Sequence, residues 1–158
     1  MNGFRKSVRL VVASASALFL SIGILSEDVR AEEDYRITNE IILSGVRVSP
    51  ASMGGRTHIA FLLENLSAER VLFGGITIAD AEQSRIVASL GNGGKTILDS
   101  IPIAPGEVLS VDGEAIWIEV DGLAKDLRPR GEIGATVTLG AVVIPISLTV
   151  DDGYKPMN

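Results

Sequence analysis

The chain of 158 residues has no cysteine, one histidine and one tryptophan, and its aromatic fraction is only 4 %. Without cysteine, the sequence excludes disulfide bonds and thiolate metal sites. Because His58 is the one histidine and no nucleophile motif accompanies it, a hydrolytic triad is not supported. Runs of basic residues are also missing, which argues against nucleic acid binding. We therefore predict that the chain is not an enzyme and has no nucleic acid partner.

The first 31 residues show the order of features that is typical of a secretory signal peptide. Three basic residues lie within the first nine positions, and an uncharged, mostly apolar run follows over residues 10–25. Val29 and Ala31 complete a cleavage-site pattern, so we expect the mature chain to begin at Glu32. The alternative is an uncleaved anchor, but a membrane span needs about 20 apolar residues and this run is shorter.

Removal of this leader makes the rest of the chain strongly acidic. The whole-chain counts of 14 basic and 20 acidic residues lose four and two, which leaves 10 and 18. An acidic exported domain is a poor candidate for binding nucleic acid or an anionic membrane surface. We predict a periplasmic or secreted protein with no stable membrane insertion after cleavage of the signal peptide.

Short stretches of alternating apolar and polar residues, separated by turn signals, make up most of the mature sequence. In the clearest stretch, Ile116, Ile118 and Val120 alternate with Trp117, Glu119 and Asp121. Alternate side chains share one face of a strand, so we expect the three aliphatic residues to be buried and Glu119 and Asp121 to be exposed. With no long amphipathic helix in the pattern, we predict an all-β, antiparallel β-sandwich.

Several turn and edge features of this sandwich follow from glycine and proline. Asp112-Gly113 is a hairpin signal, and residues 91–94 form a second flexible turn. Gly74-Gly75 interrupts a strand and predicts a bulge or a bend. Pro145 cannot donate to a β-ladder, which places its strand at an edge or at a bulge. The expected organisation is a signal peptide over 1–31, a tail over 32–40, the sandwich over 41–150 and a tail over 151–158.

Three segments of the chain resemble the periplasmic copper chaperone family PCu(A)C. They are residues 61–65 with 69–72, residues 103–106 leading without a gap to 122–123, and residues 127–131 followed by 137–139. The resemblance covers residues 41–150, nearly the whole mature chain. It implies a cupredoxin-like sandwich, which is also immunoglobulin-like in architecture. It also implies export to an envelope compartment and a link to copper homeostasis.

Family members hold Cu(I) with two His and two Met, which are ligands that suit this ion. On the resemblance, the family's first His falls at Val87, and its closing His-x-Met falls at Trp117 and Glu119. The loop that should supply a Met, residues 90–101, contains none. The resemblance therefore implies the fold, whereas the residues predict a degenerate metal site and no bound cofactor. We expect Val87 and Trp117 to lie close together, with Leu90 or Leu98 nearby.

Three functional hypotheses remain open at this point. The first is an accessory or partner-binding envelope protein that uses Trp117, Glu119 and Asp121 as its contact surface. The second is a genuine metal carrier with different ligands, namely Met53, His58 and Glu119. The third is a structural or adhesion-type module. His58 also has a simple structural interpretation, as a hydrogen-bonded residue in a buried strand. Trp117 is either a cap on the edge of the core or an exposed aromatic anchor.

Overall fold

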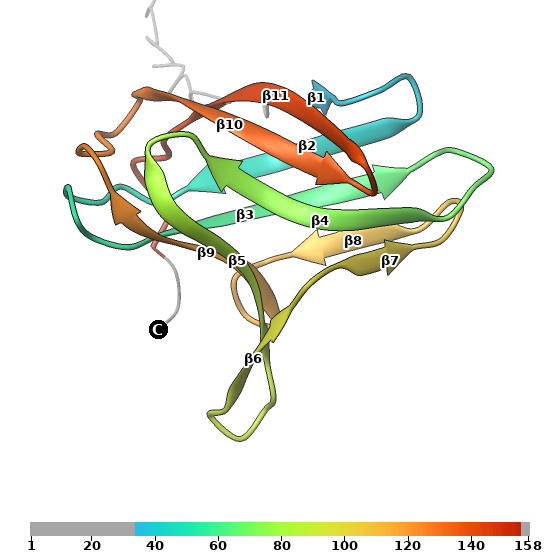
Figure 1. Cartoon of the computed structure of the whole chain (residues 1–158), viewed down its shortest axis with the longest axis horizontal. Coiled ribbons are helices and arrows are strands. Elements are labelled where there is room, and N and C mark those ends of the chain that lie inside the picture. The colour runs from blue at the N-terminus through green and yellow to red at the C-terminus, as the bar shows by residue number, and fades with distance from the viewer. Residues whose placement is uncertain (1–33, 156–158) are drawn as a thin grey trace, which may run out of the picture. The chain divides into compact units, whose positions relative to one another are not determined.

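The computed structural model describes residues 34–155, which consist of strands and the loops between them (Figure 1). The predicted signal peptide lies outside the described residues. In chain order the strands are β1 (Tyr35–Arg36), β2 (Ile41–Val48), β3 (Thr57–Asn65), β4 (Val71–Ile78), β5 (Ala81–Ser89), β6 (Lys95–Leu98), β7 (Ile101–Ile103), β8 (Val108–Val111), β9 (Ile116–Leu123), β10 (Glu132–Leu139) and β11 (Val142–Thr149). No helix in the described part of the chain is long and apolar enough to cross a membrane.

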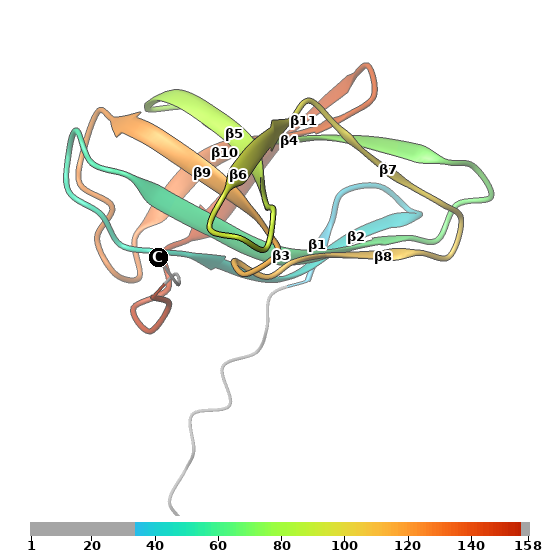
Figure 2. The same cartoon turned by 90° about the horizontal axis from the view of Figure 1, so that it is seen from below.

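The strands form two antiparallel sheets, as the sequence predicts. One has the order β1-β2-β3-β9-β5-β6, with β8 as a seventh strand beside β3, and the other has the order β11-β10-β4-β7. The two sheets pack as layers, which Figure 2 shows from below. Between them, the ring of Phe61 on β3 meets the ring of Phe73 on β4 edge to face, with centroids 5.4 Å apart. The all-β sandwich is therefore confirmed.

Aliphatic side chains from alternate positions of both sheets fill the space between the layers. On β9, Ile118 and Val120 are fully buried, which confirms the expected inward face of this strand. Ile116, at the start of the strand, is only partly buried but still packs against the core. Burial of one such side chain contributes about 1.5–3 kcal/mol by transfer bookkeeping. Because alternate side chains of a strand point to opposite faces, burial of Ile118 and Val120 places Trp117, Glu119 and Asp121 on the outer face of the sheet.

Strands β8 and β9 do not form a hairpin, so the prediction at Asp112-Gly113 is wrong. Both strands pair with the same edge of β3, β8 with its second half and β9 with its first half. The loop between them is closed by a hydrogen bond from the Gly113 N–H to the carbonyl of Ile116 at 3.0 Å. Asp112 Oδ1 accepts the backbone N–H groups of Glu114 at 2.8 Å and Ala115 at 3.1 Å. An Asp-Gly pair favours a tight turn, both in a β-hairpin and in a loop between strands that do not pair. Here β8 and β9 each pair with β3, so the turn belongs to such a loop.

The glycine and proline signals elsewhere are confirmed. The ladder between β4 and β10 shifts register between Thr138 and Leu139, beside Gly75, which has a φ of 114°. Pro145 lies on β11, the edge strand of its sheet. The turn at residues 91–94 joins β5 to β6 as an antiparallel hairpin. Beyond β11, Tyr154 is buried and packs beneath the guanidinium of Arg47, whose Cζ lies 4.9 Å from the ring centroid.

Candidate functional site

Most of the candidate residues named in the sequence analysis lie on the outer face of the seven-stranded sheet. Side chains directly opposite each other in an antiparallel pair share a face. Glu119 on β9 lies opposite His58 on β3 and Arg85 on β5. Two residues earlier on β9, Trp117 lies opposite Val87. The face therefore has two adjacent parts. We call Arg56, His58, Arg85, Glu119 and Asp121 the charged cluster, and we call Trp117, Val87 and Ile97 the apolar row.

Two arginines and two carboxylates neutralise one another in the charged cluster. Arg85 Nη2 lies 2.6 Å from Glu119 Oε1 and also contacts Asp121 Oδ2. Arg56 donates from Nε to Asp121 Oδ1 at 2.6 Å, and its Nη1 lies 3.3 Å from Glu119 Oε2. Each carboxylate thus meets both guanidiniums. Such charge-assisted hydrogen bonds are stronger than neutral ones, and they tie β3, β9 and β5 together across the sheet.

Glu119 is buried, so the expectation that it is exposed is wrong. Its side chain is 8 % exposed, and Asp121 is intermediate at 26 %. The register is as predicted, because Ile118 still faces the core. The outer face is covered by its own long side chains: Arg85, at 24 % exposure, lies against Glu119 from β5. A carboxylate can be removed from water in this way because two guanidiniums compensate its charge.

His58 borders the charged cluster, and its imidazole is mostly buried. Its Nε2 lies 3.9 Å from Glu119 Oε2, and its side chain is 13 % exposed. Burial lowers the pKa of His58 below its ordinary value, and the opposing effect of Glu119 does not outweigh it. Arg56 behaves in the opposite sense, because its hydrogen bond to Asp121 raises its pKa. The cluster therefore balances two positive and two negative charges around a neutral imidazole.

The apolar row continues the same face toward the edge of the sheet. Trp117 is 7 % and Val87 is 3 % exposed, and the two are direct partners across β9 and β5. Their predicted proximity is confirmed. The third member is Ile97, which lies opposite Val87. The resemblance led us to expect Leu90 or Leu98 at this place. Leu98 pairs with Ile86 and so belongs to the other face, and Leu90 is 59 % exposed in the turn after β5. Lys95 Nζ lies 5.0 Å from the Trp117 ring centroid, within cation–π range.

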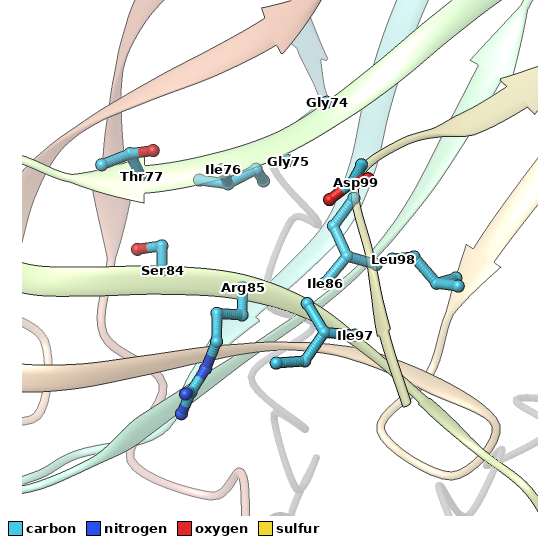
Figure 3. Close-up of a pocket in the computed structure, with 10 residues that line it drawn as sticks. All are labelled: Gly74, Gly75, Ile76, Thr77, Ser84, Arg85, Ile86, Ile97, Leu98 and Asp99. Atoms are coloured by element: carbon cyan, nitrogen blue, oxygen red, sulfur yellow. The ribbon is translucent and has the colours of Figure 1, made fainter. Parts of the chain in front are cut away.

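A small cavity of about 220 Å³ opens where β4 and β5 diverge into different sheets (Figure 3). The bulge at Gly74-Gly75 forms one wall, and Ser84 and Arg85 form the other. Ser84 Oγ and Arg85 Nε are buried and have no hydrogen-bond partner among the described residues. The figure shows the Arg85 guanidinium directed away from Gly75 and Thr77, and its Nη2 contacts Glu119 of the charged cluster.

The fold is similar to that of solved PCuAC domains. The copper-bound PCuAC domain from PmoF2 matches with a TM-score of 0.62 at 16 % identity, covering 75 % of this chain and 97 % of that domain. The apo PCuAC domain from PmoF1 matches with a TM-score of 0.59 at 10 % identity, covering 75 % and 98 %. This chain has a PCuAC-like fold. No protein-family model and no curated protein matches the sequence.

The residues that the resemblance places at the family's ligand positions do not fit a copper ion. Val87 has no donor atom, the indole nitrogen of Trp117 only donates, and Glu119 has both oxygens engaged by arginines. Cu(I) prefers thioether, thiolate and imidazole ligands. Met53 is 67 % exposed in the loop before β3, where its backbone N–H bonds Asp126. Among residues 34–155, no group of three or more His, Cys, Asp or Glu is placed to hold a metal.

Two members of the charged cluster were not selected from the sequence. Arg56 precedes His58 by two positions and Arg85 precedes Val87 by two, so each shares a face with a residue that was selected. This period-2 relation was the available signal. It remained hidden because Arg56 lies in the loop before β3, and because the sequence pattern does not say that Arg85 on β5 lies opposite Glu119 on β9.

Proposed function

We propose that this chain is an exported PCuAC-like protein whose copper site has been replaced by direct side-chain interactions. In this proposal it acts as an accessory or partner-binding protein of the cell envelope, linked to copper homeostasis, and not as a copper carrier. The observation that supports it is the engagement of all three family-equivalent positions. Val87 and Trp117 pack against each other, and Glu119 is bound by two arginines. In this role the strands need no ion to hold them together.

A Cu(I) competition titration against a strong chelator tests the loss of the metal site. We expect the chain to retain no copper beyond weak surface binding, because no soft ligand occupies the equivalent positions. Retention of one ion per chain would overturn the proposal. It would favour the second candidate, a carrier that uses Met53, His58 and Glu119, for which the 3.9 Å approach of His58 to Glu119 is the supporting observation. In that case His58→Ala should release the ion.

The export step has its own measurement. Expression of the full chain in a bacterium and mass spectrometry of the periplasmic fraction should give a mature species that begins at Glu32. Recovery of a species that retains residues 1–31 would mean that the leader is an anchor. This result is independent of copper binding, so the two parts of the proposal can fail separately.

The partner role is assigned to the outer face of the seven-stranded sheet. Of the three contact residues expected from the sequence, Trp117 and Glu119 are buried and Asp121 is intermediate. Arg56 next to Asp121 is 52 % exposed and enlarges the accessible part. Chemical cross-linking in the envelope, followed by affinity purification, should recover a specific protein with the wild-type chain but not with Arg56→Ala/Asp121→Ala. Capture that is unaffected by this double variant would favour the structural or adhesion-type module.

A further inference from the structure

Strand β6 forms the outer edge of the seven-stranded sheet, and among residues 34–155 no strand pairs with the other side of its backbone. The ladder to β5 covers its other side, from Lys95 to Leu98. In the cartoon, the β5–β6 hairpin projects away from the two layers (Figure 1). An open strand edge is a template for pairing with another chain, and most proteins shield such edges.

The direction of the backbone groups on β6 follows from one hydrogen bond. Leu90 donates its N–H to the carbonyl of Gly94 across the hairpin, so the Leu90–Gly94 pair is hydrogen-bonded. Hydrogen-bonded and non-hydrogen-bonded pairs alternate along an antiparallel ladder. Thr96 and Leu98 therefore direct their backbone groups toward β5. Lys95 and Ile97 direct theirs toward the open edge. Asp99 follows directly after β6, which ends at Leu98, and lies in a bend of the chain.

The side chains along this edge of β6 are complementary to those of a second, antiparallel copy of the same edge. Ile97 is 59 % exposed although it lies opposite the buried Val87, so an apolar side chain is left uncovered at the edge. Lys95 lies two residues before it and Asp99 two residues after it, and both are exposed. In an antiparallel pairing of two β6 strands with Ile97 opposite Ile97, each Lys95 lies opposite Asp99 of the other copy.

Other registers lack this match. A two-fold axis perpendicular to the sheet keeps the outer face of both copies on one side, so the paired residues must have the same parity. A shift that pairs Lys95 with Ile97 leaves Asp99 without a cation. A shift that pairs Ile97 with Asp99 places a carboxylate against an apolar side chain. The register centred on Ile97 brings the two isoleucines together and makes two opposite-charge pairs, each worth a fraction of a kcal/mol to about 1 kcal/mol in sheets.

We propose that this chain forms a symmetric dimer in which two β6 strands pair antiparallel, with Ile97 at the two-fold axis. The partner that fits this edge is thus a second copy of the chain. The two seven-stranded sheets become continuous, and the open backbone groups of Ile97 are satisfied by those of Ile97 in the other copy. The inference goes beyond the proposed function and does not depend on it, because no residue of the charged cluster lies in the contact.

Charge exchange tests the register. Sedimentation velocity of the purified chain over a concentration series should show a monomer–dimer equilibrium that weakens with added salt. Lys95→Glu places two like-charge pairs in the contact and should weaken dimerisation by at least about tenfold, and so should Asp99→Lys. The double variant Lys95→Glu/Asp99→Lys restores opposite charges and should recover dimerisation to within about threefold of wild type. Since it also lacks the Lys95 contact with Trp117, recovery cannot come from that contact.

A cysteine cross-link tests the two-fold axis directly, because the chain has no cysteine of its own. Cα atoms in a hydrogen-bonded antiparallel pair are about 5.5 Å apart, which suits a disulfide. Ile97→Cys should therefore give a covalent dimer under mild oxidation. Val143→Cys, at 60 % exposure on β11 of the other sheet, is the matched control and should cross-link much more slowly.

A monomer at every concentration, together with equal cross-linking of the two cysteine variants, would overturn the proposal. A dimer that is unaffected by either single charge change, or not recovered by the double variant, would also overturn it, because the contact would then lie elsewhere or in another register. Failure of this dimer has no bearing on copper binding, which the chelator competition measures separately.

Discussion

The charged cluster and the apolar row lie side by side on one face of the seven-stranded sheet, yet they exclude water in different ways. The apolar row buries an indole against Val87, and no specific geometry beyond close packing is required. The charged cluster buries a carboxylate, which is possible only because Arg56 and Arg85 approach it from the two neighbouring strands. The stability of the apolar row depends on the apolar area that it buries. The stability of the charged cluster depends on the presence of every charged partner.

This contrast shows that β9 is held to its neighbours by two kinds of side-chain contact, without a metal ion. Trp117 and Glu119 stand where the resemblance places the family's closing ligands. Trp117 belongs to the apolar row and connects β9 to β5. Glu119 belongs to the charged cluster and connects β9 to β3 and β5. A single ion that joined several strands would thus correspond here to two unrelated sets of contacts.

Truncation of the apolar row should have the largest effect. Trp117→Ala removes an almost fully buried indole and leaves a cavity, so we expect a loss of about 3–5 kcal/mol in the free energy of unfolding. Urea denaturation followed by circular dichroism measures it. Ile97→Ala, in the same row but 59 % exposed, is the matched control and should cost less than about 1 kcal/mol. Equal losses in the two variants would mean that Trp117 is not buried in solution.

Breaking the charged cluster should have the next largest effect. Glu119→Gln keeps the shape of the side chain but leaves two guanidiniums with one carboxylate. Removal of one partner from a fully buried pair costs about 3–5 kcal/mol, and we expect about 2 kcal/mol here because Arg56 and Arg85 retain contact with water.

An exposed ion pair provides the comparison for that variant. Asp80 and Lys125 form a pair with side chains 49 % and 57 % exposed. Asp80→Asn should therefore change the free energy of unfolding by no more than about 1 kcal/mol. If Glu119→Gln were as mild as Asp80→Asn, the charged cluster would be no more than a set of solvated surface pairs.

The smallest expected effect is the pH dependence that His58 contributes. Its pKa is lowered in the fold, chiefly by burial, so between the folded pKa and the unfolded value of about 6.5 the unfolded chain binds more protons. Stability should therefore rise with pH through this interval and fall as the pH drops below about 6.5. One proton limits the slope to about 1.4 kcal/mol per pH unit.

Replacement of the imidazole isolates this contribution. Urea denaturation of His58→Gln between pH 5.5 and pH 7.5 should give a flatter dependence than that of the wild type. An unchanged slope would assign the dependence to carboxylates, and a slope of opposite sign would mean that Glu119 holds His58 protonated.

The fold class and the inward face of β9 could be predicted from the amino-acid pattern alone. Alternation along a strand reports which side chains share a face, and a buried aliphatic face leaves a single acceptable register. For this reason Ile118 and Val120 were correctly placed in the core. The proximity of Val87 and Trp117 was correct for a different reason, because it came from the resemblance to a known family.

The cover on the other face of β9 depends on the order of the strands in the sheet, which the pattern does not reveal. Alternation says nothing about which strands are neighbours, and Arg56 and Arg85 lie 65 and 36 residues from Asp121 along the chain. The missing information on strand order also explains the wrong prediction of a hairpin at Asp112-Gly113. Strands β8 and β9 both pair with the same edge of β3 and not with each other. A lone carboxylate on a strand is expected to face water, and it becomes a buried residue only when the sheet order supplies its counter-charges.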